Sequence, residues 1–329
     1  MNKFIKISKI LFLLFFLYSC GSVGEALQGK KRSDQGDEFL INKTIMIVGI
    51  LKELNSEPRV AATPGTVKDM IKCGLTVHVE SNAGKKSFIT DEQYKESGAI
   101  IIQSSEELLK NIDIALSVMA PSQNHISMLK PNSIIISFCQ TTRELDFVRA
   151  IKDVPLTGFS MHLIPRTTLA QKMDALSSQA NIAGYKAVLI AASQLGIYMP
   201  LLMTAAGTIR PAKVLILGAG VAGLQAIATA KRLGAQVEAF DVRPVVKEQV
   251  ESLGAKFIEV DSNTDEGVGE GGYAKETSEE YKNRQQELIH EHISKSDIVI
   301  TTALIPGKPA PLLIPKTMVD SMKPGSVIM

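Results

Sequence analysis

The sequence predicts an α/β protein of two Rossmann-like domains with mostly parallel sheets, joined by a long helix across a cleft. From residue 44 onward, short runs of Ile, Val and Leu alternate with helical patterns, an order typical of parallel sheets with right-handed crossovers. The chain has 329 residues, enough for two domains. Aromatic residues make up 5% and Trp is absent, so the core must be mostly aliphatic, as in buried parallel strands.

The composition also excludes several classes of function. The formal net charge of +2 gives no reason to expect a nucleic-acid surface, so no nucleic-acid partner is predicted. Cys20, Cys73 and Cys139 form no CxxC pair, which argues against a disulfide framework and a structural zinc site. The histidines are scattered, and we expect no metal ligands.

Residues 1–20 have the layout of a signal segment, with lysines followed by the apolar run Ile10–Tyr18 and then small residues. The run is too short for a comfortable membrane span, which needs ~20 apolar residues. A lipoprotein cleavage site at Cys20 and an uncleaved signal anchor are the alternatives. Residues 21–43 are polar and predict a linker or a second targeting segment. The signal suggests secretory-route entry to an organelle, with the mitochondrion or the bacterial inner membrane as alternative locations.

We expect residues 44–165 to form the N-terminal α/β domain. Thr63 followed by Pro64 is a good helix start, and Asp91 and Ser104 are candidate caps for two further helices. The expected strands are 44–49, 75–80, 99–102, 112–117, 133–138 and 154–159. The expected helices are 63–73, 91–97, 104–110, 123–129 and 142–151.

For residues 166–195 we expect a loop and a long connecting helix over 174–195. For residues 196–329 we expect a second Rossmann domain that is truncated within its last strand. The long helix carries small residues that allow close packing, namely Ala180, Ala183, Gly184 and Ala187. The expected strands of this half are 213–217, 236–240, 256–259, 297–301 and 326–329. The expected helices are 221–233, 244–253, 279–294 and 315–321.

A dinucleotide fingerprint lies in the second half. The buried strand Lys213–Leu217 leads directly into the run Gly218-Ala219-Gly220-Val221-Ala222-Gly223, and a helix follows that Gly234 ends. The next strand ends at Asp241. Because strand, glycines, helix, second strand and acid come in the required order, this context predicts NAD(H) binding far more strongly than a lone glycine motif. The alternative is a Gly-rich turn in some other α/β sheet.

Each part of the fingerprint has a physical role. Gly218 permits the tight turn, Gly220 lets the backbone approach the pyrophosphate, and Gly223 lets helix and strand pack closely. The helix N-terminus offers N–H groups to the phosphates. Asp241 is expected to accept hydrogen bonds from the adenosine ribose and to repel a 2′-phosphate, which favours NAD over NADP, although Arg243 weakens this argument. A solvated acid at a strand end is the alternative for Asp241.

Several further motifs resemble one family, the NAD(H)-binding domain I of proton-translocating NAD(P) transhydrogenase. The resemblance runs from about residue 45 to the last residue. The segments that carry it are Arg59–Pro64, Pro165-Arg166, Gln171, Asp174–Tyr185, Asp241–Pro244, Gly272–Lys275 and Thr301–Pro311.

The resemblance implies a transhydrogenase in which hydride passes directly between NADH and NADP⁺. NADP(H) would lie on a separate domain or subunit, and membrane domains absent from this chain would couple the transfer to proton movement. Such chemistry needs no general acid or base, but both rings must be held at near-attack distance with water excluded. The chain would then be membrane-associated through the rest of the complex, and it is expected to be a homodimer.

The resemblance also implies roles for individual residues. Arg166, Gln171, Asp174 and Ser177 would form the loop beside the nicotinamide, where Arg166 and Asp174 fix the carboxamide and ring, Ser177 adds a hydrogen bond, and Gln171 reaches toward the partner nucleotide. An ordinary surface ion pair is the alternative for Arg166 and Asp174.

The acidic, Gly-rich segment 261–278 would be a lid with Tyr273 near its tip, and plain disorder is its alternative. Thr301, Thr302 and Ala303 follow a strand and would line the nucleotide pocket. The complete set expected to bind NAD(H) is Gly218, Ala219, Gly220, Val221, Ala222, Gly223, Asp241, Val242, Arg243, Tyr273, Thr301, Thr302 and Ala303.

Two rival functions remain open. An alanine dehydrogenase-like oxidoreductase shares the predicted fold but needs a Lys within Ser117–Pro121 and a His near Cys139 or Gln140, and neither is present. Only Arg59 matches its carboxylate-binding Arg. Ser117 also replaces a Lys usual in transhydrogenases, which ring-to-ring transfer does not require. The second rival is a non-catalytic NAD-binding fragment, since the chain stops within a predicted strand.

Overall fold

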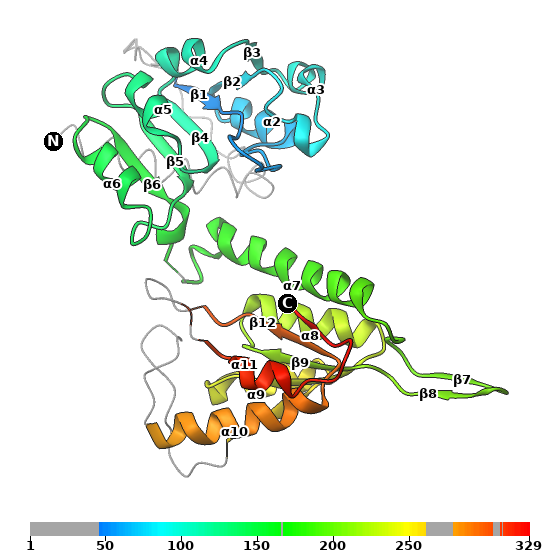
Figure 1. The fold of residues 1–329 in the computed structure, drawn as a ribbon. Coiled ribbons are helices and arrows are strands. Elements are labelled where there is room, and N and C mark those ends of the chain that lie inside the picture. Colours follow the sequence, from blue (N-terminus) through cyan, green and yellow to red (C-terminus); the bar gives the residue numbers. More distant parts are fainter. Residues whose placement is uncertain (1–45, 166, 261–278, 305–309, 311) are drawn as a thin grey trace, which may run out of the picture. The chain divides into compact units, whose positions relative to one another are not determined.

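The protein is an α/β molecule with two parallel sheets, as the sequence predicts (Figure 1). The computed structural model describes residues 46–165, 167–260, 279–304, 310 and 312–329. The predicted signal-like segment and polar linker, residues 1–43, therefore lie outside the described residues. The chain divides into two compact units, with the boundary between Asp174 and Ala175.

The sheet of the first unit has six parallel strands in the order β3-β2-β1-β4-β5-β6. Its strands are β1 (Ile47–Ile50), β2 (Thr76–Glu80), β3 (Ile100–Ile102), β4 (Ile114–Met119), β5 (Ile134–Phe138) and β6 (Thr157–Ser160). Its α-helices are α2 (Pro64–Lys72), α3 (Asp91–Glu96), α4 (Ser105–Asn111), α5 (Gln123–Met128) and α6 (Leu145–Lys152). Apolar clusters bury both faces of this sheet, which explains why its strands are nearly continuous hydrophobic runs.

Two of the three predicted helix caps of this unit are confirmed. The Thr63 and Ser104 hydroxyls accept backbone N–H groups of the first turns of α2 and α4, and Pro64 occupies the first helical position of α2. The prediction for Asp91 is wrong, because Thr90 caps α3 through a capping box. The Asp91 carboxylate instead accepts the Ser81 hydroxyl at 2.8 Å and fixes the turn after β2.

The sheet of the second unit has five parallel strands in the order β11-β10-β9-β12-β13. Its strands are β9 (Lys213–Leu217), β10 (Gln236–Phe240), β11 (Lys256–Ile258), β12 (Ile298–Thr301) and β13 (Val327–Ile328). Its helices include α8 (Val221–Arg232), α9 (Lys247–Ser252), α10 (Glu279–Lys295) and α11 (Lys316–Asp320). Gly234 has a φ of +86° and follows the end of α8, as predicted.

The long helix α7 (Ala175–Gln194) packs closely on α8 within the second unit. A Cβ added to Gly184 would lie 2.0 Å from the Ala222 carbonyl oxygen, so only glycine permits this approach. The predicted close packing through small residues is thus confirmed at Gly184. No helix among the described residues is both long and apolar enough to cross a membrane.

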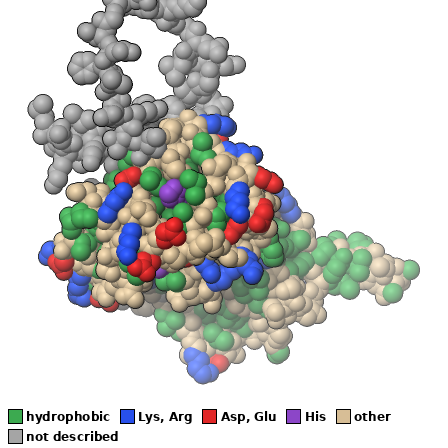
Figure 2. All heavy atoms as spheres, turned by 90° about the horizontal axis from the view of Figure 1, so that it is seen from above, with side chains coloured by type: hydrophobic (Ala, Val, Ile, Leu, Met, Phe, Trp, Pro, Cys, Tyr) green, Lys and Arg blue, Asp and Glu red, His purple; other side chains and the backbone are tan. Residues whose placement is uncertain are grey.

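A short antiparallel hairpin in the second unit was not predicted. Its strands, β7 (Leu202–Thr204) and β8 (Gly207–Ile209), have three residues each and are exposed throughout. Figures 1 and 2 both show the hairpin projecting from its unit, and the side chains along it in Figure 2 are largely hydrophobic. Two strands of this length give almost no period-two signal in a sequence.

The two sheets share a structural anchor at the start of the fourth strand. Asp113 and Asp297 directly precede β4 and β12, and each carboxylate accepts the backbone N–H of the first residue of the neighbouring strand at 2.8 Å. Each also pairs with a lysine from the turn before the next strand, Lys130 at 2.8 Å and Lys323 at 2.7 Å. The two units therefore use the same order for their first five strands and the same anchoring chemistry.

Candidate functional site

The candidate site lies where the strand order of the second sheet reverses. Strands β9 and β12 are neighbours, and the chain continues from β9 toward β10 and β11 on one side and from β12 toward β13 on the other. Open α/β sheets bind ligands in the crevice at such a reversal, outside the carboxyl ends of the strands. Gly218 follows β9 and Thr302 follows β12, so both lie at this edge.

Two glycines of the turn are required by the protein itself. Gly218 has a φ of +103°, and its N–H donates to the Phe240 carbonyl oxygen at 2.8 Å, which ties the turn to the end of β10. A Cβ added to Gly223 would lie 1.8 Å from the Gly218 carbonyl oxygen. The turn and the first residues of α8 thus fold against each other at a distance that no side chain tolerates, as the sequence predicts for Gly223.

Gly220 has a different reason to be glycine. A Cβ added there would meet no atom of the described residues within 4 Å, and its backbone is extended, with φ −78° and ψ −166°. Neither sterics within the described residues nor backbone strain therefore requires glycine at this position. Free space over the backbone is what an approaching pyrophosphate needs, so the residues present fit a dinucleotide.

The start of α8 is also suited to an anion. Gly220 is the N-cap of α8, and no described side chain caps the helix. The first N–H groups of an uncapped helix lack intrahelical partners, and the helix dipole places partial positive charge there. This arrangement attracts a phosphate group without any basic side chain.

Asp241 is built into the turn rather than solvated. One carboxylate oxygen accepts the Ala219 N–H at 2.7 Å. The Arg243 guanidinium donates to both oxygens, from Nε and Nη2, each at 2.9 Å. The Arg243 backbone N–H donates a further hydrogen bond at 2.9 Å. The Asp241 side chain is 7% exposed, so the alternative of a solvated acid at a strand end is wrong.

Thr302 holds the glycine turn from the neighbouring strand. Its hydroxyl donates to the Gly218 carbonyl oxygen at 2.8 Å, and its N–H donates to the Leu217 carbonyl oxygen at 2.8 Å. Thr301 is exposed and bonds the carbonyl oxygen of Met329 instead. Ala303 is half-buried. The structure thus gathers Gly218, Asp241 and Thr302 at one edge, while the role of Thr301 and Ala303 in a pocket stays a prediction.

The predicted nicotinamide-side residues are only partly described. Gln171 is exposed and begins the 3₁₀ turn η3 (Gln171–Met173), and Asp174 follows it half-buried. Ser177 lies half-buried in the first turn of α7. Arg166 and Tyr273 lie outside the described residues, as does the predicted lid segment 261–278. The functional roles of these residues stay predictions.

Sequence reasoning missed a matching carboxylate in the first unit. Glu80 ends β2, as Asp241 follows β10, and one of its oxygens accepts the Lys52 N–H at 2.9 Å. Lys52 is the second residue after β1, as Ala219 is the second after β9. The other Glu80 oxygen accepts the Ser105 hydroxyl at 2.8 Å. An acid at the end of a second strand was the available signal, but no glycine run accompanied it.

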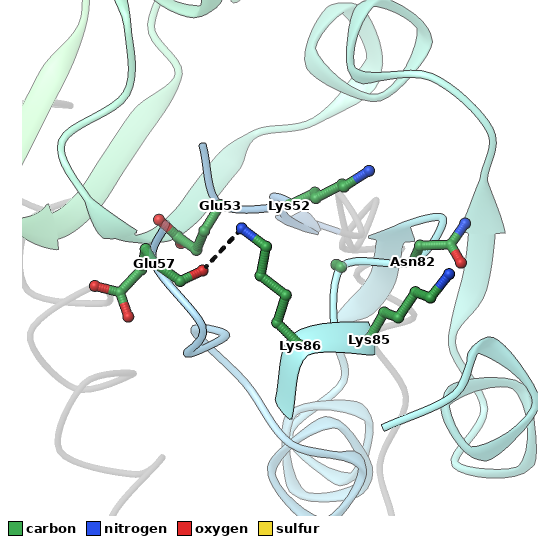
Figure 3. Close-up of a pocket in the computed structure, with 7 residues that line it drawn as sticks. Lys52, Glu53, Glu57, Asn82, Lys85 and Lys86 are labelled. Atoms are coloured by element: carbon green, nitrogen blue, oxygen red, sulfur yellow. Dashed lines mark hydrogen bonds between the residues drawn. The ribbon is translucent and has the colours of Figure 1, made fainter. Parts of the chain in front are cut away.

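The carboxyl edge of the first sheet carries hollows of its own. One hollow has a volume of about 490 Å³. Lys86 reaches the Glu57 carbonyl oxygen at 3.5 Å there. The amines of Lys52 and Lys85 point away from Glu57 (Figure 3). A neighbouring hollow of about 540 Å³ is lined by Glu53, Ser117 and His125, among others.

Glu53 braces this edge of the first sheet. Its carboxylate accepts the N–H groups of Val118 at 2.5 Å and Met119 at 3.1 Å, beside an irregularity in the pairing of β4 with β5. Burial raises the pKa of Glu53, and these two backbone bonds oppose that effect. Sequence reasoning did not select Glu53, because one acid after a strand has no distinctive pattern.

Within the segments where an alanine dehydrogenase would need Lys and His, Ser117 and Cys139 are small and buried. Ser117 is 8% exposed and Cys139 is 1% exposed. Burial raises the pKa of the Cys139 thiol to about 11, so it is neutral near pH 7. Neither side chain replaces the missing acid/base pair.

A parallel sheet that reverses order beside a glycine turn, with an acid at the end of the next strand, defines a dinucleotide-binding Rossmann domain. Residues 49–183 match the family described as "Alanine dehydrogenase/PNT, N-terminal domain", and residues 187–329 match "Alanine dehydrogenase/PNT, C-terminal domain". The chain belongs to this family. Within the family it groups with NAD(P) transhydrogenase alpha subunits, which confirms the resemblance stated above.

Individual relatives support the same placement. The chain is 46% identical over 290 residues to the first part of the NAD(P) transhydrogenase alpha subunit of Rhodospirillum rubrum, covering 86% of this chain and 76% of that protein. It is 48% identical over 284 residues to "NAD(P) transhydrogenase subunit alpha" of Haemophilus influenzae, covering 86% of this chain but only 55% of that protein. The chain thus spans about half the length of the Haemophilus influenzae relative.

A solved structure agrees with the sequence matches. The transhydrogenase of Sinorhizobium meliloti superposes with a TM-score of 0.75 at 46% identity, covering 86% of this chain and 77% of that one. An alanine dehydrogenase of Methanococcus maripaludis is only 28% identical over 288 residues.

Proposed function

We propose that this chain binds NAD(H) at the glycine turn of its second unit and forms the NAD(H)-binding part of a proton-translocating NAD(P) transhydrogenase. The observation that carries the proposal is the open space over Gly220, in a turn whose other two glycines are required by internal contacts. The Gly220 backbone and the first N–H groups of α8 would hold the pyrophosphate, and Asp241 would hold the adenosine ribose.

The chain's own task in this reaction is to bind and orient. NADH, when bound, would supply a hydride from C4 of its nicotinamide to C4 of NADP⁺ held on a separate domain or subunit. Arg166 and Asp174 would fix the carboxamide, Ser177 would add a hydrogen bond, and Gln171 would reach toward the partner nucleotide. No proton transfer accompanies the hydride, so the absence of an acid/base pair at Ser117 and Cys139 is consistent with this chemistry. Coupling to proton movement would require membrane domains outside this chain.

Isotope transfer tests the proposed reaction directly. The protein would be combined with membranes that carry the remaining transhydrogenase subunits of Rhodospirillum rubrum, and supplied with NADH deuterated at C4 and with NADP⁺. We expect the deuterium to appear in NADPH without exchange with water, because the two rings react directly. Deuterium lost to water, or no NADPH above the level of the membranes alone, would refute the proposal. Turnover of NADH with pyruvate and ammonia would instead support an alanine dehydrogenase.

The predicted homodimer also belongs to the proposal. The β7–β8 hairpin exposes Leu202 at 38%, Met203 at 71% and Ile209 at 47%. An isolated two-stranded hairpin is marginally stable in water, and an exposed apolar patch marks an interaction surface. We expect sedimentation to give a dimer that Met203→Asp weakens, whereas a wild-type monomer at micromolar concentration would rule the dimer out.

Location is proposed on the sequence alone. Residues 1–20 would direct secretory-route entry to an organelle, and the chain would associate with a membrane through the other parts of the complex. A fluorescent protein fused to residues 1–45 should then leave the cytosol, and cytosolic fluorescence would refute the signal.

A further inference from the structure

The Asp241 carboxylate has no free acceptor site in this structure. Its two oxygens accept four hydrogen bonds: one from the Ala219 N–H, one from the Arg243 N–H, and two from the Arg243 guanidinium, at 2.7 to 2.9 Å. A carboxylate offers about four lone-pair positions. A ribose hydroxyl can therefore bond Asp241 only if one of these donors leaves.

The guanidinium is the donor able to leave. The Ala219 and Arg243 N–H groups belong to the backbone that follows the paired strands β9 and β10, so neither can leave unless that backbone moves. The guanidinium is carried by a flexible side chain that is 21% exposed, so it can shift off the carboxylate without moving the backbone.

The first unit shows that such a turn does not need an arginine. Glu80 makes the equivalent bond to the Lys52 N–H, and its other oxygen is satisfied by the neutral Ser105 hydroxyl. The bidentate Arg243 guanidinium is thus present only in the unit that carries the glycine turn, and the turn does not need it for stability.

We propose that Arg243 is a specificity-determining latch, which occupies both oxygens of Asp241 and must be displaced by the adenosine ribose of NADH. This proposal rests on the proposed function. A bidentate pair between two opposite charges is stronger than the hydrogen bonds from uncharged ribose hydroxyls that replace it, so the latch lowers the affinity for NADH. The displaced guanidinium remains beside the 2′ position, where it would neutralise Asp241 and offset its repulsion of a 2′-phosphate.

Two substitutions separate these effects. Arg243→Met keeps most of the side-chain volume but removes the charge, whereas Arg243→Lys keeps the charge but loses the bidentate fork. Calorimetric titration should show that both variants bind NADH about three- to tenfold more tightly than wild type. The ratio of the NADPH and NADH dissociation constants should rise about tenfold or more in Arg243→Met and less in Arg243→Lys, because only the latter can pair with the phosphate.

A double-mutant cycle tests whether Arg243 acts through Asp241. Asp241→Asn leaves no anion to latch, so adding Arg243→Met to it should not tighten NADH binding. Arg232→Met, at the exposed end of α8, removes a charge at the opposite edge of the sheet and should change neither dissociation constant. Equal or weaker NADH binding in Arg243→Met, or tightening that persists beside Asp241→Asn, would overturn the latch. A wild-type protein that bound no NADH would instead overturn the proposed function.

Discussion

The open space over Gly220 makes Gly220→Ala an informative substitution, because it separates folding from binding. In the part of the chain that the structure describes, an added Cβ would meet no atom within 4 Å, and the φ of −78° suits alanine. The same substitution at Gly223 would place a Cβ 1.8 Å from the Gly218 carbonyl oxygen, and there the backbone would have to move. Gly196 offers a matched control, since a Cβ there also meets nothing within 4 Å.

The expected magnitudes follow from these contacts. At an N-cap, alanine is less favourable than glycine by about 0.5–1 kcal/mol, which lowers Tm by about 2–4 °C in a unit of this size. Binding should suffer more, because a methyl group over Gly220 displaces the pyrophosphate from the N–H groups of α8. A hydrogen bond to a charged group contributes about 1.5–3 kcal/mol, so the loss of even one weakens NADH binding at least about tenfold.

Calorimetry and thermal denaturation on the same samples would measure both effects. We expect Gly220→Ala to melt within a few degrees of wild type and to lose NADH affinity, while Gly196→Ala changes neither. Gly223→Ala should lose stability before binding can be compared. If Gly220→Ala bound NADH within about twofold of wild type, a difference below about 0.5 kcal/mol, the pyrophosphate could not lie over this residue. The reasoning from the glycine turn would then be refuted.

Three further outcomes follow from named contacts. Thr302→Val removes the hydroxyl that bonds the Gly218 carbonyl oxygen. It should lower the free energy of unfolding, measured by urea denaturation, by about 1 kcal/mol and weaken NADH binding. Thr301→Val, at the exposed neighbour, should change the free energy of unfolding little. Burial raises the pKa of Glu53, so its contribution to stability is present below the unfolded-state pKa and is lost as pH rises through the folded-state pKa. The stability of wild type relative to Glu53→Gln should therefore be greater near pH 4 than near pH 7. An equal difference at both pH values would contradict this. Because the pKa of Cys139 is raised to about 11, iodoacetamide at pH 8 should alkylate it slowly in the folded protein and rapidly in urea, as peptide mass spectrometry would show.

Much of the fold could be predicted because its signals are local. Each parallel strand is an aliphatic run bounded by helix starts, and the glycine turn depends on residues within one short segment. The hairpin at 202–209 could not be predicted, because strands of three residues show no periodicity. The prediction of the Asp91 cap failed for a related reason. Thr90 and Asp91 are both good caps, and the choice depends on the Ser81 hydroxyl and the Asn82 N–H, which both bond the Asp91 carboxylate.

Within the site, the roles of Gly218 and Gly223 could be predicted because they follow from backbone geometry. The hydrogen-bond donors to Asp241 could not be predicted, because its two oxygens can accept from a ribose, from a turn or from an arginine. The choice depends on contacts between β9, β10 and the segment after β10. Glu53 shows the same limit, because the N–H groups it accepts belong to residues 65 and 66 positions away.

The carboxylate at the end of the second strand carries less functional information than its place in the fingerprint suggests. Glu80 and Asp241 each accept the N–H of the second residue after the first strand of their sheet, yet a glycine run accompanies only Asp241. The shared bond is therefore a property of the scaffold, which stabilises the turn in both units. Function must depend on what the second unit adds: space over Gly220, an uncapped helix start, and a movable cation on Asp241. Replacing Glu80 by Gln should accordingly affect stability alone, whereas Asp241→Asn should affect both stability and nucleotide choice.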